Sequence, residues 1–192
     1  MKLHRTISID RPLLVVALEE EARHLHAADL PVLVTGVGKI RAAWALAAVL
    51  AKQRPSSVIN LGTAGALNDN LRGTHLVSRV IQHDYDHQGI SGLTGTPYGG
   101  APIDLRPEGL VLASGDRFVD GGPERDRLTA AGASLVDMEG YAVAMVAREF
   151  GLEVTLVKEV SDTAGAGAAS DWRRTLDACA ARLGGWLSQY RA

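Results

Sequence analysis

The chain has 192 residues, the length of one domain or at most two small ones. Its 20 basic and 22 acidic residues give a formal net charge of −2, which argues against nucleic acid as a partner because nucleic-acid binders normally carry a basic excess. Hydrophobic residues make up 46% of the chain, which is enough for a core and excludes a disordered chain.

A single cysteine, Cys179, excludes an internal disulfide and a Cys-rich zinc site, and it fits a reducing compartment. The N-terminal residues are largely polar, and the apolar stretch at 42–51 is too short to span a bilayer. We therefore expect a cytoplasmic protein with no signal peptide and no membrane partner. Because repeats and linkers are absent from the sequence, residues 1–192 are expected to form one domain.

Short apolar runs alternate with helical segments along the first half of the chain. The apolar runs predict buried strands at 13–17, 31–35 and 57–61, the last ending at Gly62, and a further β-rich run at 76–81. Helices are predicted at 19–26, where acids occupy the first turn, and at 39–52, which is rich in Ala and Leu.

The second half begins with a segment rich in Gly, Pro, Asp and Thr. Residues 84–108 are interpreted as a long loop with one short strand, and loops of this length are usually functional or mobile. The alternation then resumes, with strands predicted at 110–113, 134–137 and 153–160 and helices at 123–131, 139–150 and 171–190. Apolar residues at spacings of three and four, from Trp172 to Tyr190, place Cys179 in the packing face of the last helix.

This alternation predicts an α/β fold, with a mostly parallel sheet and helices on both of its faces. Ligands of such sheets bind beyond the carboxyl ends of the strands, so the residues that follow each strand are the candidate site. These strand ends are 17–21, 62–67, 114–119, 137–139 and 161–162.

Carboxylates and glycines dominate these strand ends. Three of them carry acids: Glu19 to Glu21, then Asp137 with Glu139, then Asp162. Two are read as Gly-rich turns, at 62–65 and 114–116, where backbone N–H groups can approach a ligand closely. Carboxylates accept hydrogen bonds from sugar hydroxyls and suit acid–base work on a positively charged transition state.

Two other motifs are considered and set aside. The segment from Gly36 to Arg41 has Arg where a dinucleotide fingerprint needs its third Gly, and Leu33 stands where a phosphate-binding loop needs its first. The segment 83–87, His-Asp-Tyr-Asp-His, could hold a metal, but it lacks a complete ligand set and is more typical of a polar segment leaving a strand. We expect neither a metal nor a cofactor.

Taken in order, the strand ends resemble those of the nucleoside phosphorylase/nucleosidase superfamily, and most closely the 5'-methylthioadenosine/S-adenosylhomocysteine nucleosidases. The resemblance spans about 13–164 and rests on Ala-Leu-Glu-Glu-Glu at 17–21, Asn-Leu-Gly-Thr-Ala-Gly at 60–65, Ser-Gly-Asp-Arg-Phe-Val at 114–119, and Val-Asp-Met-Glu at 136–139 with Ser-Asp at 161–162. It implies a three-layer fold with a partly barrel-like mixed sheet, usually a homodimer, that hydrolyses the N-glycosidic bond of a purine nucleoside.

The resemblance also implies residue roles. Asp162 matches the acid that protonates the purine, and Glu21 matches the base that activates water. Glu139, with Met138, matches the group that holds the ribose hydroxyls. Phe118 matches the ring that stacks on the base, and the backbone of Val119 the part that reads the purine edge. The other residues expected to line or support the site are Thr63, Ala64, Gly65, Ser161, Asp137 and Lys158.

Each role has a purely structural alternative. Asp162 could cap a turn or a helix, and Glu21 and Glu139 could be acids in first helical turns. Phe118 could belong to the core. Co-occurrence at successive strand ends favours the functional interpretation of all four.

The sequence departs from the family pattern at several positions. Asp137 stands where Glu is frequent, Gly140 where Ala is usual, Thr63 in place of Ser, and Lys158 where an Arg near the attacking water is expected. The chain also lacks room for a helix between residues 102 and 110, close to the segment that shapes the 5' pocket and dimer contact in the family. The reaction type is therefore better supported than the 5' substituent.

Several alternative functions remain open. Within the same superfamily, the alternatives are a futalosine-hydrolase-like enzyme and a purine nucleoside phosphorylase. A phosphorylase needs an anion site after the first strand, where this chain has three consecutive Glu, so water is favoured as nucleophile. A nucleoside-binding protein without activity is the alternative of another class. An unrelated α/β hydrolase is disfavoured because no Gly-x-Ser-x-Gly occurs.

Overall fold

The computed structural model describes residues 1–25 and 28–190. These residues form an α/β fold whose strands are β1 Lys2–His4, β2 Leu13–Val16, β3 Val32–Val34, β4 Val58–Ala66, β5 Thr74–Gln82, β6 Ile103–Asp104, β7 Leu110–Ser114, β8 Leu135–Asp137 and β9 Val154–Asp162. The helices are α1 Glu19–Ala22, α2 Lys39–Leu50, α3 His87–Thr94, α4 Gly122–Ala130, α5 Gly140–Glu149 and α6 Ala168–Gln189.

The sheet is mixed and partly closed into a barrel. The strand order is β1-β3-β2-β4-β8-β7-β5-β6, and β9 pairs with both β4 and β5. The ring β4-β8-β7-β5-β9 therefore closes on itself, with parallel pairing at β4–β9, β5–β7 and β7–β8 and antiparallel pairing at β4–β8 and β5–β9. Both the α/β class and the partly barrel-like mixed sheet implied by the family resemblance are confirmed.

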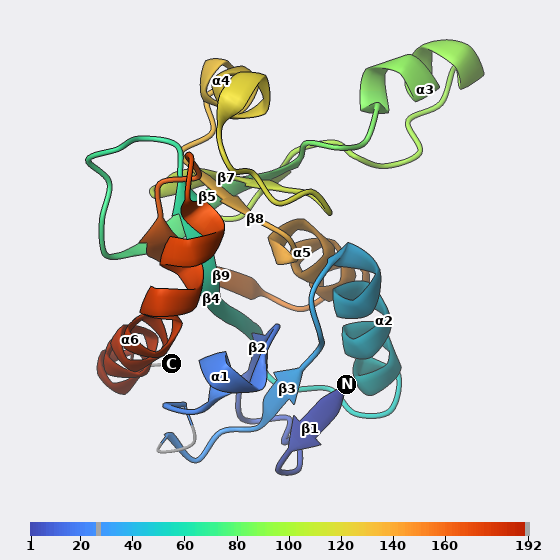
Figure 1. The fold of residues 1–192 in the computed structure, drawn as a ribbon. Helices are drawn as coiled ribbons and strands as arrows, with labels where there is room; N and C mark the ends of the chain where they lie inside the picture. Colours follow the sequence, from blue (N-terminus) through green and yellow to red (C-terminus); the bar gives the residue numbers. More distant parts are fainter. Residues whose placement is uncertain (26–27, 191–192) are drawn as a thin grey trace.

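Helices cover the two sides of the sheet (Figure 1). The helices α2 and α5 pack side by side on one side, whereas α6 packs along β9 on the other, next to α1. The helix α3 projects away from the rest of the molecule and contains no buried residue. Within the described ranges, no helix is both long and apolar enough to cross a membrane.

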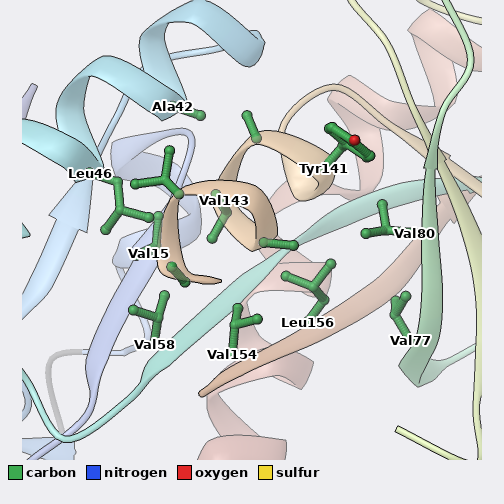
Figure 2. Packing of buried hydrophobic residues seen from close by; sticks show 14 of the residues in the cluster. Val15, Ala42, Leu46, Val58, Val77, Val80, Tyr141, Val143, Val154 and Leu156 are labelled. Atoms are coloured by element: carbon green, nitrogen blue, oxygen red, sulfur yellow. The ribbon is translucent and has the colours of Figure 1, made fainter. Parts of the chain in front are cut away.

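The strand β2 shows how the sequence pattern builds the core. All four of its residues are buried, and the alternation of side chains along a strand sends Leu13 and Val15 to one face and Leu14 and Val16 to the other. Figure 2 shows Val15 among residues of the first cluster, which includes side chains from α2 and α5. The second cluster contains side chains from α6. Burial on both faces explains the unbroken apolar run.

Most predicted elements are confirmed within a few residues, but the Gly-rich segment at 62–65 is not a turn. It continues β4 as far as Ala66, with a register shift against β9 at Ala64 and Gly65. The glycine is needed for close approach, because a Cβ on Gly65 would lie 2.9 Å from Asp162 Oδ1. A glycine that allows close packing was mistaken for one that allows a turn.

Three further corrections concern short elements. The loop predicted at 84–108 contains the expected short strand, β6, but also α3, which Asp86 caps by accepting a hydrogen bond from Gly89 N (2.9 Å). The helix predicted at 19–26 is helical only to Ala22, and residue 26 lies outside the described residues. The edge strand β1 was not predicted. Residues 105–109 join β6 to β7 without a helix, as the shortened sequence suggested.

Candidate functional site

A cavity of about 210 Å³ lies at the carboxyl ends of β2, β7, β8 and β9 and beside the second half of β4. It is lined by Ala17, Leu18, Glu21, Val37, Thr63, Ala64, Gly65, Arg117, Phe118, Val119, Val136, Asp137, Met138, Glu139, Ser161, Asp162 and Trp172. All the site residues predicted from the sequence are therefore brought together here, except that Lys158 is not part of the lining.

Glu21 differs from its two acidic neighbours because it is buried, with 3% of its surface exposed. Its Oε2 accepts hydrogen bonds from the backbone N–H groups of Ala17 (3.0 Å) and Leu18 (3.1 Å). Its Oε1 accepts from Thr63 N (3.0 Å) and lies 3.3 Å from Thr63 Oγ1. Glu19, in contrast, is exposed and pairs with Lys2. The interpretation of Glu21 as one more exposed helix acid is therefore wrong.

Asp162 ends β9 with its carboxyl group largely buried. Its Oδ2 accepts a hydrogen bond from Ser161 Oγ (2.8 Å), and its Oδ1 accepts one from Ala164 N (2.8 Å). It thus caps the following turn and also lines the cavity. Burial raises the pKa of Asp162 above the ordinary aspartate value, so this group holds a proton to higher pH than a surface aspartate does.

Glu139 lines the cavity, and its side chain does not cap its own helix, α5. Its Oε1 accepts a hydrogen bond from the backbone N–H of Gly38 (2.7 Å), in the loop between β3 and α2. Burial and then the nearby Asp137 carboxylate raise the pKa of Glu139 to about 8.

Lys158 lies beneath the cavity with its side chain 1% exposed. Its Nζ is 2.8 Å from Asp137 Oδ2 and 2.7 Å from Asn60 Oδ1. Asp137 also accepts hydrogen bonds from Ser114 Oγ and from Gly140 N (2.8 Å). Asn60 was not named as a supporting residue from the sequence, although a polar side chain inside a buried apolar strand is a usable signal.

Much of the remaining lining is apolar or aromatic, and it also includes the exposed cation Arg117 and the hydroxyl residues Thr63 and Ser161. Phe118 is 46% exposed beside the cavity, so its assignment to the core is wrong, whereas Val119 is buried. Trp172, assigned from the sequence only to the packing face of the last helix, reaches the cavity and donates a hydrogen bond from Nε1 to Thr63 Oγ1 (3.1 Å). No local pattern could reveal this contact, because it joins α6 to β4.

The polar segment at 83–87 does not gather into one cluster. The imidazole of His83 lies 3.2 Å from Glu124, and Asp84 pairs with Lys39, whereas Asp86 caps α3. Among the described residues, no group of three or more His, Cys, Asp or Glu side chains is placed to hold a metal ion.

Comparison with known proteins assigns this chain to a family. The family model described as "Phosphorylase superfamily" matches residues 20–110 and 101–190. The chain therefore belongs to the phosphorylase superfamily.

Relatives and solved structures agree with this assignment. A 5'-methylthioadenosine/S-adenosylhomocysteine nucleosidase of Marinomonas sp. is 29% identical over 160 residues, covering 71% of this chain and 69% of the relative. One of Geobacillus sp. is 26% identical over 183 residues, covering 81% and 77%. The fold matches that of a Helicobacter pylori nucleosidase of this name, crystallised with butyl-thio-DADMe-Immucillin-A, with a TM-score of 0.84 at 20% identity and coverage of 94% and 97%. It also matches a mutant futalosine hydrolase of the same organism, with a TM-score of 0.85 at 19% identity and coverage of 94% and 97%.

Replacement of Lys158 by Met tests the buried ion pair. It leaves the Asp137 carboxylate buried without its cation, so we expect the free energy of unfolding to fall by about 3–5 kcal/mol. Urea denaturation at pH 7 measures the loss. The double variant Lys158→Met/Asp137→Asn, which removes both charges, should recover most of it, and a stability equal to that of the original chain in the single variant would contradict the assignment.

Gly140→Ala tests whether the packing around position 140 requires glycine. A Cβ at this position would lie 2.6 Å from Leu112 Cδ2 and 3.0 Å from Asp137 Oδ2. We expect a loss of about 1–3 kcal/mol in urea denaturation, because the packed neighbours must move. Gly185→Ala in α6 is the matched control: a Cβ there meets nothing within 4 Å, so the change should be neutral or stabilising.

Glu139→Gln tests the raised pKa of Glu139. The folded chain binds this proton more tightly than the unfolded chain, so the stability of the original chain should decline as pH rises from about 4.5 towards 8. The Gln variant cannot ionise and should lose less stability over the same range. Urea denaturation at several pH values compares the two, and parallel profiles would show that Glu139 titrates normally.

Proposed function

We propose that the chain is an N-ribosyl hydrolase that cleaves the glycosidic bond of a purine nucleoside of the methylthioadenosine or S-adenosylhomocysteine type. The observation that carries this proposal is a single cavity lined by two buried carboxyl groups, Glu21 and Asp162, in different environments. The names of the curated relatives support the same reaction.

The two carboxyl groups would divide the chemistry. Cleavage of an N-ribosidic bond places positive charge on the sugar and negative charge on the departing base. Asp162, whose pKa is raised by burial, would protonate the base as it leaves. Glu21 would accept a proton from the water that attacks the anomeric carbon. A pair of carboxyl groups around an oxocarbenium-like transition state follows the logic of glycoside hydrolysis.

Other lining residues would bind the substrate. Glu139, with Met138 beside it, would hold the ribose hydroxyls, because the oxygens of a carboxyl group accept hydrogen bonds from hydroxyl groups. Phe118, exposed beside the cavity, would stack on the purine, and the backbone at Val119 would read its edge. Lys158, which does not line the cavity, would hold Asp137 in position through their ion pair.

Water fits this site better than phosphate as the nucleophile. The lining holds four carboxyl groups against one cationic side chain, the exposed Arg117, and Lys158, buried beneath the cavity, already pairs with Asp137 and Asn60. A phosphate dianion would meet the carboxylate of Glu21 where it needs cations. The structural match to futalosine hydrolase makes futalosine the second substrate to examine.

We also propose a homodimer that works in the cytoplasm. The projecting helix α3 and the loop after it expose Leu93 (86%) and Tyr98 (67%), and α2 exposes Ile40 and Trp44. Exposed large apolar side chains of this kind support a protein interface. The free thiol of Cys179 fits a reducing compartment.

Product analysis in phosphate-free buffer tests the reaction. The purified protein is given methylthioadenosine, S-adenosylhomocysteine, adenosine, inosine and futalosine, and free base is measured by chromatography. We expect base release without phosphate. Asp162→Asn and Glu21→Gln should each lower kcat by about 10²–10⁴-fold while nucleoside binding persists.

The exposed neighbour Glu20 supplies the control, because Glu20→Gln alters an acid in the same turn outside the cavity and should leave turnover unchanged. Release that requires phosphate would make the chain a phosphorylase. Binding without base release in either buffer would favour the non-catalytic nucleoside-binding protein.

A further inference from the structure

Trp172 makes a contact that none of the roles above uses. It lies near the start of α6, is partly buried, and lines the cavity. Its Nε1 donates a hydrogen bond to Thr63 Oγ1 at 3.1 Å. This contact ties the helix that follows the Asp162 turn to the strand that supports Glu21.

The direction of this hydrogen bond determines what the Thr63 hydroxyl can do. An indole N–H is only a donor, whereas a hydroxyl group has one proton and two acceptor lone pairs. Trp172 therefore occupies a lone pair of Thr63 and leaves its proton free. The acceptor facing that proton is Glu21 Oε1, 3.3 Å from Thr63 Oγ1. The three groups form a directed chain in which each hydrogen bond polarises the next.

Glu21 is fully engaged in this arrangement. A carboxylate offers about four lone-pair sites, and four donors face them. Three donors are backbone N–H groups, of Ala17, Leu18 and Thr63, which the strands and the turn hold in place. The fourth, the Thr63 hydroxyl, can turn its proton elsewhere. Glu21 can accept a proton from water at a free lone pair only after that hydroxyl turns away.

We propose that Trp172 is a positioning residue for the activation of water, an inference that rests on the proposed hydrolase function. Trp172 holds the Thr63 oxygen in place while the Thr63 proton turns from Glu21 towards the cavity. The freed lone pair of Glu21 Oε1 then takes a proton from water as the water oxygen bonds to the anomeric carbon. The bond from that carbon to the base nitrogen breaks, its electron pair stays with the base, and Asp162 supplies the base with a proton. Trp172 and Thr63 keep their own protons throughout.

A double-mutant cycle tests this proposal. Trp172→Phe keeps an aromatic ring and removes the N–H, and Thr63→Val keeps the shape and removes the hydroxyl. We expect Trp172→Phe to lower kcat about tenfold with KM within about twofold. In the Thr63→Val background, the same change should cost little more, because its partner is gone. Thr63→Ser, which retains a hydroxyl, should restore the dependence on Trp172.

Trp186→Phe is the matched control, since Trp186 lies in the same helix, stacks on Tyr190 and does not line the cavity. It should leave kcat unchanged. A role for Trp172 in packing alone predicts that the losses from Trp172→Phe and Thr63→Val multiply, and that outcome would overturn the proposal.

Indole N–H resonances in ¹⁵N NMR give a readout independent of turnover. The Trp172 resonance is assigned by its absence in Trp172→Phe; Thr63→Val should shift it and speed its exchange with solvent, while the Trp44 and Trp186 resonances stay in place. An unshifted Trp172 resonance would overturn this inference and leave the proposed function intact. If the original chain releases no base from any nucleoside, both fall, even where the NMR shift shows that the contact exists.

Discussion

The site depends on one buried cation. Lys158 projects from β9 and binds Asn60 of β4 and Asp137 of β8, so a single ammonium group joins three strands of the closed ring below the cavity. Burial of a charge is costly unless the charge is paired and hydrogen-bonded. The buried ammonium group of Lys158 therefore favours conformations in which both Asp137 and Asn60 remain in contact with it. Because Asp137 directly precedes Met138 and Glu139, the pairing also fixes where these two residues enter the cavity.

Three departures from the family pattern meet at this cation. The resemblance to the nucleosidases led us to expect Arg, Glu and Ala where this chain has Lys158, Asp137 and Gly140, and in the structure the Asp137 carboxylate binds both Lys158 Nζ and Gly140 N. A Cβ at position 140 would lie 3.0 Å from that same carboxylate. The shorter acid therefore sits close to the backbone, where glycine leaves it room. Lys158 and Gly140 both contact Asp137, so we interpret the three residues as one packed arrangement rather than as three separate losses of function.

The sequence predicted the site better than the shape of the sheet. Apolar runs located the strands, and the rule that ligands bind at their carboxyl ends brought Glu21, Glu139 and Asp162 together correctly. Local sequence patterns gave wrong or incomplete predictions where contacts between distant segments determine the structure. Gly65 was assigned to a turn because its close approach to Asp162 cannot be seen in one segment. The helix α3 contains two glycines in eight residues and no buried residue, so its composition indicated a loop, and Trp172 was assigned to the packing face of its helix.

Environment, rather than residue type, separates the carboxyl groups of this cavity. Glu21 faces four donors, three of them backbone N–H groups, which suits a carboxylate that stays in one orientation. Glu139 accepts one hydrogen bond, from Gly38, and its pKa is raised by burial and by Asp137. The pKa of Asp162 is raised by burial in spite of its two donors. Carboxyl groups in different environments can take different roles in one site, whereas identical surroundings would give both the same role. The fold creates this difference because Glu21 lies against backbone N–H groups that follow β2 and belong to β4, whereas Asp162 lies at the buried end of β9. The positions at which the strands end therefore determine the environment of each carboxyl group.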